Sequence, residues 1–326
     1  MKSKTLIAIL GLACGFATHA NAADVVLKYA HIFNPEHAIH KGALELARIV
    51  KEKTNGRIEV RILPSEQLGS ERQVMEGLQF GSVEMGYVTG NVVDSFEPAA
   101  GLLSLPYIVR DFEHGFAIED GPIGDEIKRR VLEKTSVRIL GHNVTGFRML
   151  ATKARRVQSL KDFAGLKVRV PESPVMVDTF RALGANPTPL PWGELYTALQ
   201  TNLVDAGEAP PAALADIKVF EVAKLLTQTN HVYTNGYIMI NDRVWQRLSA
   251  EDRAILAEAA LANQALQRRL TVEAQSSILE KLKADGVEVI SIDTGPLQAA
   301  VAPIYEKFAK SLEGGAELIA KIQKSK

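Results

Sequence analysis

The sequence predicts an α/β protein of roughly two domains, with mostly parallel sheets flanked by helices and one long helix lying across both. Strand-like and helix-like patterns alternate along the N-terminal third, which is typical of a parallel sheet with helical crossovers. The stretch 249–286 contains no Pro or Gly before Gly286, as a single long helix requires. The chain of 326 residues is also longer than one hydrophobic core commonly holds.

The first residues, 1–22, are expected to be a signal peptide that is not part of the fold. Two early lysines precede an apolar run too short to span a membrane, and the sequence ANA at 20–22 fits the small-x-small cleavage pattern. We therefore expect export to the periplasm with cleavage near Ala22. A cut at Cys14, giving a lipid-anchored protein, is the weaker alternative because the preceding GLA is a poor lipobox.

Composition excludes several classes of function. The only cysteine is Cys14, so the mature chain has no disulfide, thiolate nucleophile or cysteine-rich zinc site. Removing the two lysines of the signal peptide leaves 36 basic and 38 acidic residues, a net charge of −2. This balance gives no reason to expect nucleic acid or an anionic membrane as a partner. After residue 22 no apolar run approaches the ~20 residues of a membrane-spanning helix, so the mature protein is expected to be soluble.

The N-terminal part has the pattern of a βαβαβ unit. Apolar residues alternate in the expected strands and recur at helical spacing between them. We expect strands at 25–31, 57–63 and 83–88, with helices at about 39–50 and 70–79. Such units form parallel sheets.

The pattern then restarts without a Pro/Gly/Ser-rich linker, so we expect ordinary strands to connect the domains and act as hinges. Helices are expected at 124–135, 175–183 and 193–201, and strands at 137–140, 146–152, 166–171 and about 237–241. The long helix that follows begins with Ser249 as N-cap, has acidic residues in its first turn and lysines near its end. At ~1.5 Å per residue its length is on the order of 50 Å, so it should reach across both domains.

Motifs for catalysis and metal binding are missing. The sequence lacks the glycine-rich phosphate-binding loops, the G-x-S-x-G elbow and the H-E-x-x-H zinc motif, which lowers the expectation of an enzyme. His31, His37 and His40 lie close in sequence, but no carboxylate or cysteine at matching spacing completes a metal site, so none is expected. His31 and Thr89 instead end parallel strands, the edge at which open α/β sheets bind ligands.

Two arginines are the stronger candidates for binding. Arg148 in TGFRML and Arg169 in KVRVP each place a guanidinium within an apolar strand. The planar fork of an arginine matches a carboxylate bidentately, and two arginines on neighbouring strands could hold one carboxylate from two sides. Each could equally be a solvent-facing or ion-paired structural residue, because alternate residues of a strand face opposite sides.

Other polar and aromatic residues allow two interpretations. Trp192 could be a core residue or a pocket wall, and Glu71 could be a favourable charge in a first helical turn or an acceptor for a ligand hydroxyl. Glu208 could pair with an arginine next to the site. Glu172 follows the second arginine and its proline closely enough to face the same ligand.

Several segments, in order along the mature chain, resemble the DctP-like solute-binding proteins of tripartite ATP-independent periplasmic (TRAP) transporters. These include NGRIEVRILPSEQLGSERQVMEGL, GLKVRVPES, GANPTPLPWGELYTALQTNLVDAGEAPP and the long helix. The resemblance implies the two-lobed periplasmic binding protein fold, with an organic anion bound between the lobes. It implies one lobe of residues 23–146 plus about 235–274 and another of residues 147–234 plus about 275–326.

By this resemblance, Arg169 forms the salt bridge to the ligand carboxylate and Arg148 assists it, while Glu71 and Trp192 line the pocket. The family commonly has Asn after the glutamate of the VDGQENP-like segment, where this chain has Ala209. The carboxylate would lose one donor there. Glu172 and His31 would favour a hydroxylated ligand such as a sugar acid over a plain dicarboxylate.

The expected function is that of a periplasmic receptor that captures an organic acid and delivers it to the membrane subunits of a TRAP transporter, without a cofactor or metal and as a monomer. A component that presents its ligand to a sensor kinase is one alternative. The other is a sugar-acid-processing enzyme with Glu71, Glu172 or His31 as general base.

Overall fold

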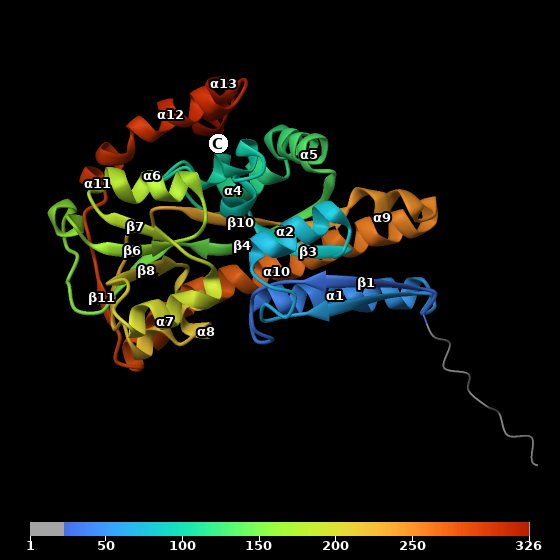
Figure 1. Ribbon diagram of the computed structural model, residues 1–326, viewed down its shortest axis with the longest axis horizontal. Helices are drawn as coiled ribbons and strands as arrows, with labels where there is room; N and C mark the ends of the chain where they lie inside the picture. The colour runs from blue at the N-terminus through green and yellow to red at the C-terminus, as the bar shows by residue number, and fades with distance from the viewer. Residues whose placement is uncertain (1–22, 326) are drawn as a thin grey trace, which may run out of the picture.

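The structure is a computed structural model that describes residues 23–325, so the expected signal peptide lies outside the described residues. Two β-sheets, each with helices packed against it, form the two-lobed α/β fold that the sequence predicts (Figure 1). The first lobe is built around one sheet and the second lobe around the other.

The first sheet has the strand order β2-β1-β3-β10-β4. Its strands are β1 (Val25–Ala30), β2 (Ile58–Leu63), β3 (Met85–Thr89), β4 (Val137–Phe147) and β10 (Tyr233–Asn241). The first three pair in parallel, which confirms the βαβαβ unit, and β10 runs antiparallel to both β3 and β4. The carboxyl ends of β1 and β3 therefore meet at one edge of the sheet.

The expected break in β4 at residue 140 is wrong. We expected separate strands at 137–140 and 146–152, with the polar residues and glycines of 141–145 between them. The strand continues because the long helix supplies partners for these polar groups: Asn143 Nδ2 donates to Asn263 Oδ1 at 3.0 Å, and the backbone N–H of His142 donates to Gln264 Oε1 at 2.8 Å.

Helices cover the first sheet, and their ends follow the local sequence. The helix α2 shows this most clearly, because Ser70 and Gln73 form a capping box at its start and Gly81 ends it with a φ of 81°. The helices of this part are α1 (Ala38–Lys53), α2 (Glu71–Phe80), α3 (Gly90–Val93), η1 (Pro98–Ser104), α4 (Phe112–Glu119), α5 (Pro122–Thr135) and α9 (Asp242–Arg247).

The second sheet has the order β11-β9-β5-β8-β6-β7. Its strands are β5 (Met149–Thr152), β6 (Lys167–Val170), β7 (Asn186–Pro189), β8 (Ala206–Ala209), β9 (Leu225–Thr227) and β11 (Glu288–Ile290). The helices η2 (Leu160–Phe163), α6 (Pro174–Ala182), η3 (Trp192–Glu194), α7 (Leu195–Gln200), α8 (Pro211–Asp216) and η4 (Val219–Glu221) connect these strands. Strand β6 pairs in parallel with β7 and β8, whereas β5 runs antiparallel to β8 and β9.

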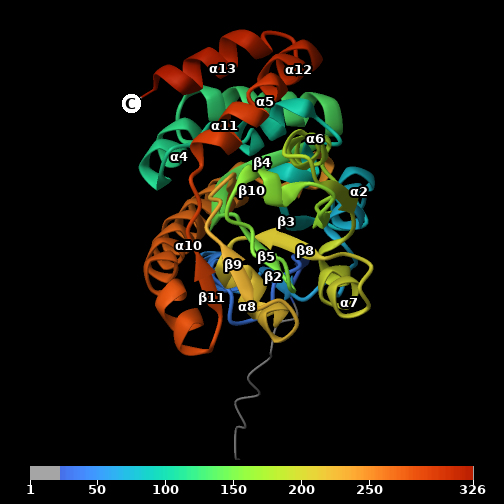
Figure 2. The ribbon, with the colours of Figure 1, turned by 90° about the vertical axis from the view of Figure 1, so that its left-hand side faces the viewer.

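The lobes are joined by short connections and by the long helix. Only Arg148 separates β4 in the first sheet from β5 in the second, and the segment 228–232 leads back from β9 to β10. The helix α10 (Ala250–Ala284) confirms the expected long helix. It packs on α1 and β4 as well as on α8 and β11, and Figure 2 shows it beside β11.

The C-terminal helices are α11 (Gly295–Val301), α12 (Pro303–Ser311) and α13 (Gly315–Lys324). The chain end, which the sequence assigned to the second lobe, also contacts helices beside the first sheet. His114 Nε2 of α4 lies 3.1 Å from the carbonyl oxygen of Ile322, and Arg130 Nη2 of α5 donates to the carbonyl oxygen of Glu313 at 2.9 Å. The chain end thus packs on helices of the first lobe.

Candidate ligand-binding site

A cavity lies between the two sheets and is lined by residues of both lobes. The first lobe contributes residues that follow β1 and β3, together with Glu71 at the start of α2. The second lobe contributes Arg169, Trp192 and Ala209, and Arg148 enters from the junction of the two sheets. Of the residues that the sequence predicted for binding, Arg169, Arg148, Glu71, Trp192 and Thr89 line this cavity, whereas His31, Glu172 and Glu208 do not.

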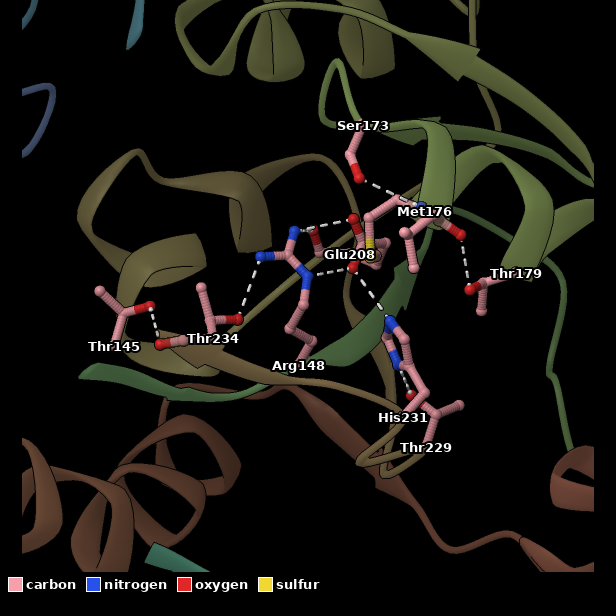
Figure 3. Close-up of polar contacts among 10 residues, drawn as sticks. Thr145, Arg148, Ser173, Met176, Thr179, Glu208, Thr229, His231 and Thr234 are labelled. Atoms are coloured by element: carbon pink, nitrogen blue, oxygen red, sulfur yellow. Dashed lines mark hydrogen bonds and ion pairs between the residues drawn. The ribbon is translucent and has the colours of Figure 1, made fainter. Parts of the chain in front are cut away.

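Arg148 is held by a carboxylate of the protein itself. Its Nη2 donates to Glu208 Oε1 at 2.7 Å and to the Glu208 carbonyl oxygen at 2.7 Å, and its Nε makes a short contact with Glu208 Oε2 (Figure 3). His231 Nε2 lies 3.0 Å from the same Oε2. Burial alone would raise the pKa of the Glu208 carboxyl, but Arg148 and His231 outweigh it and keep this pKa below its usual value. The charge of Arg148 is therefore compensated.

Arg169, in contrast, has no carboxylate within ion-pair distance among residues 23–325. Its Nε and Nη2 donate to the carbonyl oxygen of Leu190 at 2.9 and 2.5 Å, and its guanidinium lies over the ring of Trp192, 5.7 Å from the centroid. Only 2% of the residue is exposed, and burial lowers its pKa to about 10. A guanidinium stays protonated at that pKa, so the cavity contains a buried cation that lacks a counter-ion.

The two arginines do not lie on neighbouring strands, as the sequence led us to expect. Strand β8, which carries Glu208, separates β5 from β6 in the sheet. This order gives Arg148 a carboxylate partner and leaves Arg169 with carbonyl oxygen only. The two guanidinium groups reach the same cavity in different electrostatic states.

Glu71 and Thr89 form the opposite side of the cavity. The backbone N–H of Thr89 donates to Glu71 Oε1 at 2.8 Å, and the Thr89 hydroxyl donates to Glu71 Oε2 at 3.0 Å. Burial raises the pKa of the Glu71 carboxyl to about 7 in spite of these bonds. A carboxyl group in this state can accept a hydrogen bond when ionised and donate one when protonated.

His31 and Glu172 do not line the cavity. His31 is buried with its Nε2 3.1 Å from His40 Nδ1, and burial lowers its pKa to about 3, so the ring is neutral. Glu172 is partly exposed at the rim, where Arg72 Nε lies 3.4 Å from its Oε1. The preference for a hydroxylated ligand therefore gains no support from these two residues. Within residues 23–325, no group of three or more His, Cys, Asp and Glu is suited to a metal ion.

Sequence reasoning missed several polar residues of the cavity, namely Asn91, Thr145 and Thr234. Asn91 comes two residues after β3, so the rule that ligands bind at the carboxyl ends of parallel strands could have found it. Thr145 and Thr234 belong to β4 and β10, which pair antiparallel across the first sheet. Nothing in the local sequence indicates that pairing. Ala209, which replaces the expected Asn, also lines the cavity.

Known proteins resemble the whole described chain. Residues 29–311 match the model of the DctP family, described as bacterial extracellular solute-binding protein, family 7. A solute-binding protein of Roseobacter denitrificans is 34% identical over 299 residues, which cover 92% of this chain and 91% of the relative. The 2,3-diketo-L-gulonate-binding periplasmic protein of Escherichia coli is 31% identical, with 95% and 94% covered.

Solved structures agree with this assignment. A TRAP periplasmic solute-binding protein of Roseobacter denitrificans with bound L-galactonate is 32% identical, with a TM-score of 0.88 over 93% of this chain and 99% of the other. One of Polaromonas, bound to D-erythronate, is also 32% identical, with a TM-score of 0.89 over 93% and 99%. The family that the chain matches consists of solute-binding proteins of transporters and not of enzymes. The chain therefore belongs to the DctP family of bacterial extracellular solute-binding proteins and resembles the receptors of TRAP transporters throughout its two-lobed fold.

Proposed function

We propose that this chain is a periplasmic receptor that captures an organic acid, with sugar acids such as uronates and aldonates as the preferred class, and delivers it to the membrane subunits of a TRAP transporter. The names of its relatives support this class, because 2,3-diketo-L-gulonate, L-galactonate and D-erythronate are all hydroxylated carboxylates. In this proposal residues 1–22 direct export and are removed near Ala22, and the mature receptor acts as a monomer without a cofactor.

One observation supports the proposal above all others: Arg169 is buried, faces the cavity and lacks a counter-ion among the described residues. Burying an unpaired charge is unfavourable, and an organic carboxylate would provide the missing partner with the fork geometry that a guanidinium matches. Arg148 is already paired, so we assign the anchoring role to Arg169 and a supporting role to Arg148.

The proposed capture mechanism is closure of the two lobes around the ligand. In the structure, the hydroxyl of Ser95 donates to the carbonyl oxygen of Glu172 at 2.8 Å, and the backbone N–H of Gly193 donates to Glu66 Oε1 at 3.1 Å. Ser173 and Asp94 form a further hydrogen bond across the same gap. Because only the closed form brings both lobes onto a ligand, binding would shift the population towards closure.

The membrane subunits would supply passage through the membrane. No helix among residues 23–325 combines the length and the hydropathy that a membrane span needs. In this proposal the lobes correspond to residues 23–146 with about 235–274 and to residues 147–234 with about 275–312. The terminal helix α13 is assigned to the first lobe because it contacts α4 and α5.

A thermal-shift screen of the mature chain tests the proposal. We would compare D-galacturonate, L-galactonate, L-gulonate, D-erythronate and succinate with uncharged galactose. A ligand present at ~100 times its dissociation constant adds about 2.7 kcal/mol to the free energy of unfolding, which is readily measured. Stabilisation by acids but not by galactose is expected, and stabilisation by galactose alone would contradict the role of Arg169.

Two arginine variants sharpen this test. Arg169→Gln should abolish the shift that the best acid produces, because glutamine offers no charge. Arg181→Gln is the matched control, since Arg181 is an exposed residue of α6 in the same lobe. Unchanged binding by Arg169→Gln would mean that the cavity holds no carboxylate at this position.

A further inference from the structure

Two polar side chains of the cavity have no hydrogen-bond partner within residues 23–325. Asn91 is 3% exposed, and its buried Oδ1 accepts no hydrogen bond from the described residues. Trp192 is 9% exposed, and its Nε1, a donor, is likewise buried without an acceptor. Both residues line the cavity that contains Arg169, one from each lobe.

Such groups are uncommon in folded proteins, because a buried polar atom loses its hydrogen bonds to water and normally regains them inside the protein. The neighbouring polar residues of the cavity follow this rule. Thr89 is bonded to Glu71, and Thr234 accepts from Arg148. Among the polar residues that line the cavity, Asn91 and Trp192 therefore stand out as groups for which the described residues provide no partner.

The chemistry of the two groups defines what a partner must offer. An amide presents both an acceptor and a donor, and a hydroxyl group satisfies either because it both donates and accepts. The orientation of the amide does not change this conclusion. The indole N–H of Trp192 needs only an acceptor, which a hydroxyl or a carboxylate oxygen provides. An unsubstituted aliphatic acid satisfies Arg169 but leaves Asn91 unpaired.

We propose that Asn91 is a specificity-determining residue that binds a hydroxyl group of the ligand, and that the Trp192 N–H donates to a second ligand oxygen. This assignment rests on the proposed function, since it presupposes that an organic acid occupies the cavity. It divides recognition between the lobes: Arg169 in the second lobe holds the carboxylate, and Asn91 in the first lobe selects for hydroxylation. A site built to bind a hydroxyl rejects analogues that lack it far more strongly than an apolar pocket does.

The experiment compares ligands that differ by one hydroxyl. Isothermal titration of the mature chain would use D-galacturonate and its 2-deoxy, 3-deoxy and 4-deoxy analogues, with wild type and Asn91→Leu. Leucine has a similar size but cannot form the hydrogen bond. We expect one deoxy analogue to bind wild type about tenfold to a hundredfold more weakly than D-galacturonate, and this difference to fall below about twofold in Asn91→Leu.

Two controls keep the outcome interpretable. Asn186→Leu changes an exposed asparagine in β7 and should keep the full difference between the analogues. Trp192→Phe preserves the aromatic ring near Arg169 but removes the N–H, so it should weaken binding of D-galacturonate even where Asn91→Leu proves unstable.

The outcomes separate the two proposals. One outcome overturns the assignment of these residues while acid binding stands. In it, Asn91→Leu weakens the binding of D-galacturonate and of every deoxy analogue by the same factor, or weakens none of them, and Trp192→Phe binds D-galacturonate as tightly as wild type. If wild type binds neither D-galacturonate nor any other acid of the thermal-shift screen, the proposed function itself fails.

Discussion

Glu71 leads us to predict that ligand capture takes up protons. Burial raises the pKa of its carboxyl from the ordinary value of 4.5 to about 7 in the structure. An open cleft would return this carboxyl to water and its pKa towards the ordinary value. Because the pKa is higher in the closed form, closing binds a proton between about pH 4.5 and pH 7, and affinity for an organic anion rises as the pH falls through this window.

The size of the effect follows from the shift. A change of about 2.5 pH units at about 1.4 kcal/mol per unit corresponds to at most about 3.5 kcal/mol, or a few hundredfold in affinity. The charged neighbours act in known directions, since Arg169 lowers the pKa of Glu71 and Glu66 raises it. A bound carboxylate would compensate Arg169 and so raise the pKa of Glu71 further.

Isothermal titration measures this uptake directly. At pH 7, titrations with D-galacturonate in two buffers of different ionisation enthalpy should report on the order of half a proton or more bound per ligand. Glu71→Gln should reduce this number, whereas Glu76→Gln, on the same helix but with a half-exposed side chain, should not. Zero uptake by wild type, or equal uptake by wild type and Glu71→Gln, would refute the reasoning.

Two further substitutions test the closing contacts and the buried ion pair. Ser95→Ala removes the hydrogen bond to the Glu172 carbonyl oxygen, so we expect all ligands to bind roughly 2- to 10-fold more weakly, with the order of their affinities unchanged. A changed order of affinities would instead place Ser95 in contact with the ligand. Glu208→Gln leaves Arg148 buried without a counter-charge, so we expect the free energy of unfolding, measured in urea, to fall by about 3 kcal/mol. An unchanged midpoint of urea unfolding would show that Arg148 needs no charged partner.

Local sequence patterns predicted most elements because their causes are local. The alternation of strands β1 to β3 with helices, the capping box of α2 and the long helix α10 all depend on residues near one another in sequence. The expected break in β4 was wrong because its cause is not local. The partners that keep the polar residues of β4 in a strand lie on α10, more than a hundred residues away in sequence.

The candidate site was predictable as a set of residue types but not as an electrostatic arrangement. Arg148 and Arg169 have nearly equivalent sequence settings, each a guanidinium in an apolar strand. The sheet order places β8 and Glu208 against one of them and a backbone carbonyl against the other. Likewise His31 and Glu172 have plausible sequence positions but lie outside the cavity.

The sequence by itself determined the α/β class, the long bridging helix and the residue types that an anion receptor needs. Tertiary structure decided which arginine lacks a counter-ion, why burial raises the pKa of the Glu71 carboxyl to about 7, and that Asn91 lines the cavity unpaired. The physical reason is that charge and hydrogen-bonding state depend on burial and on partners brought together by long-range strand pairing, which no local pattern encodes.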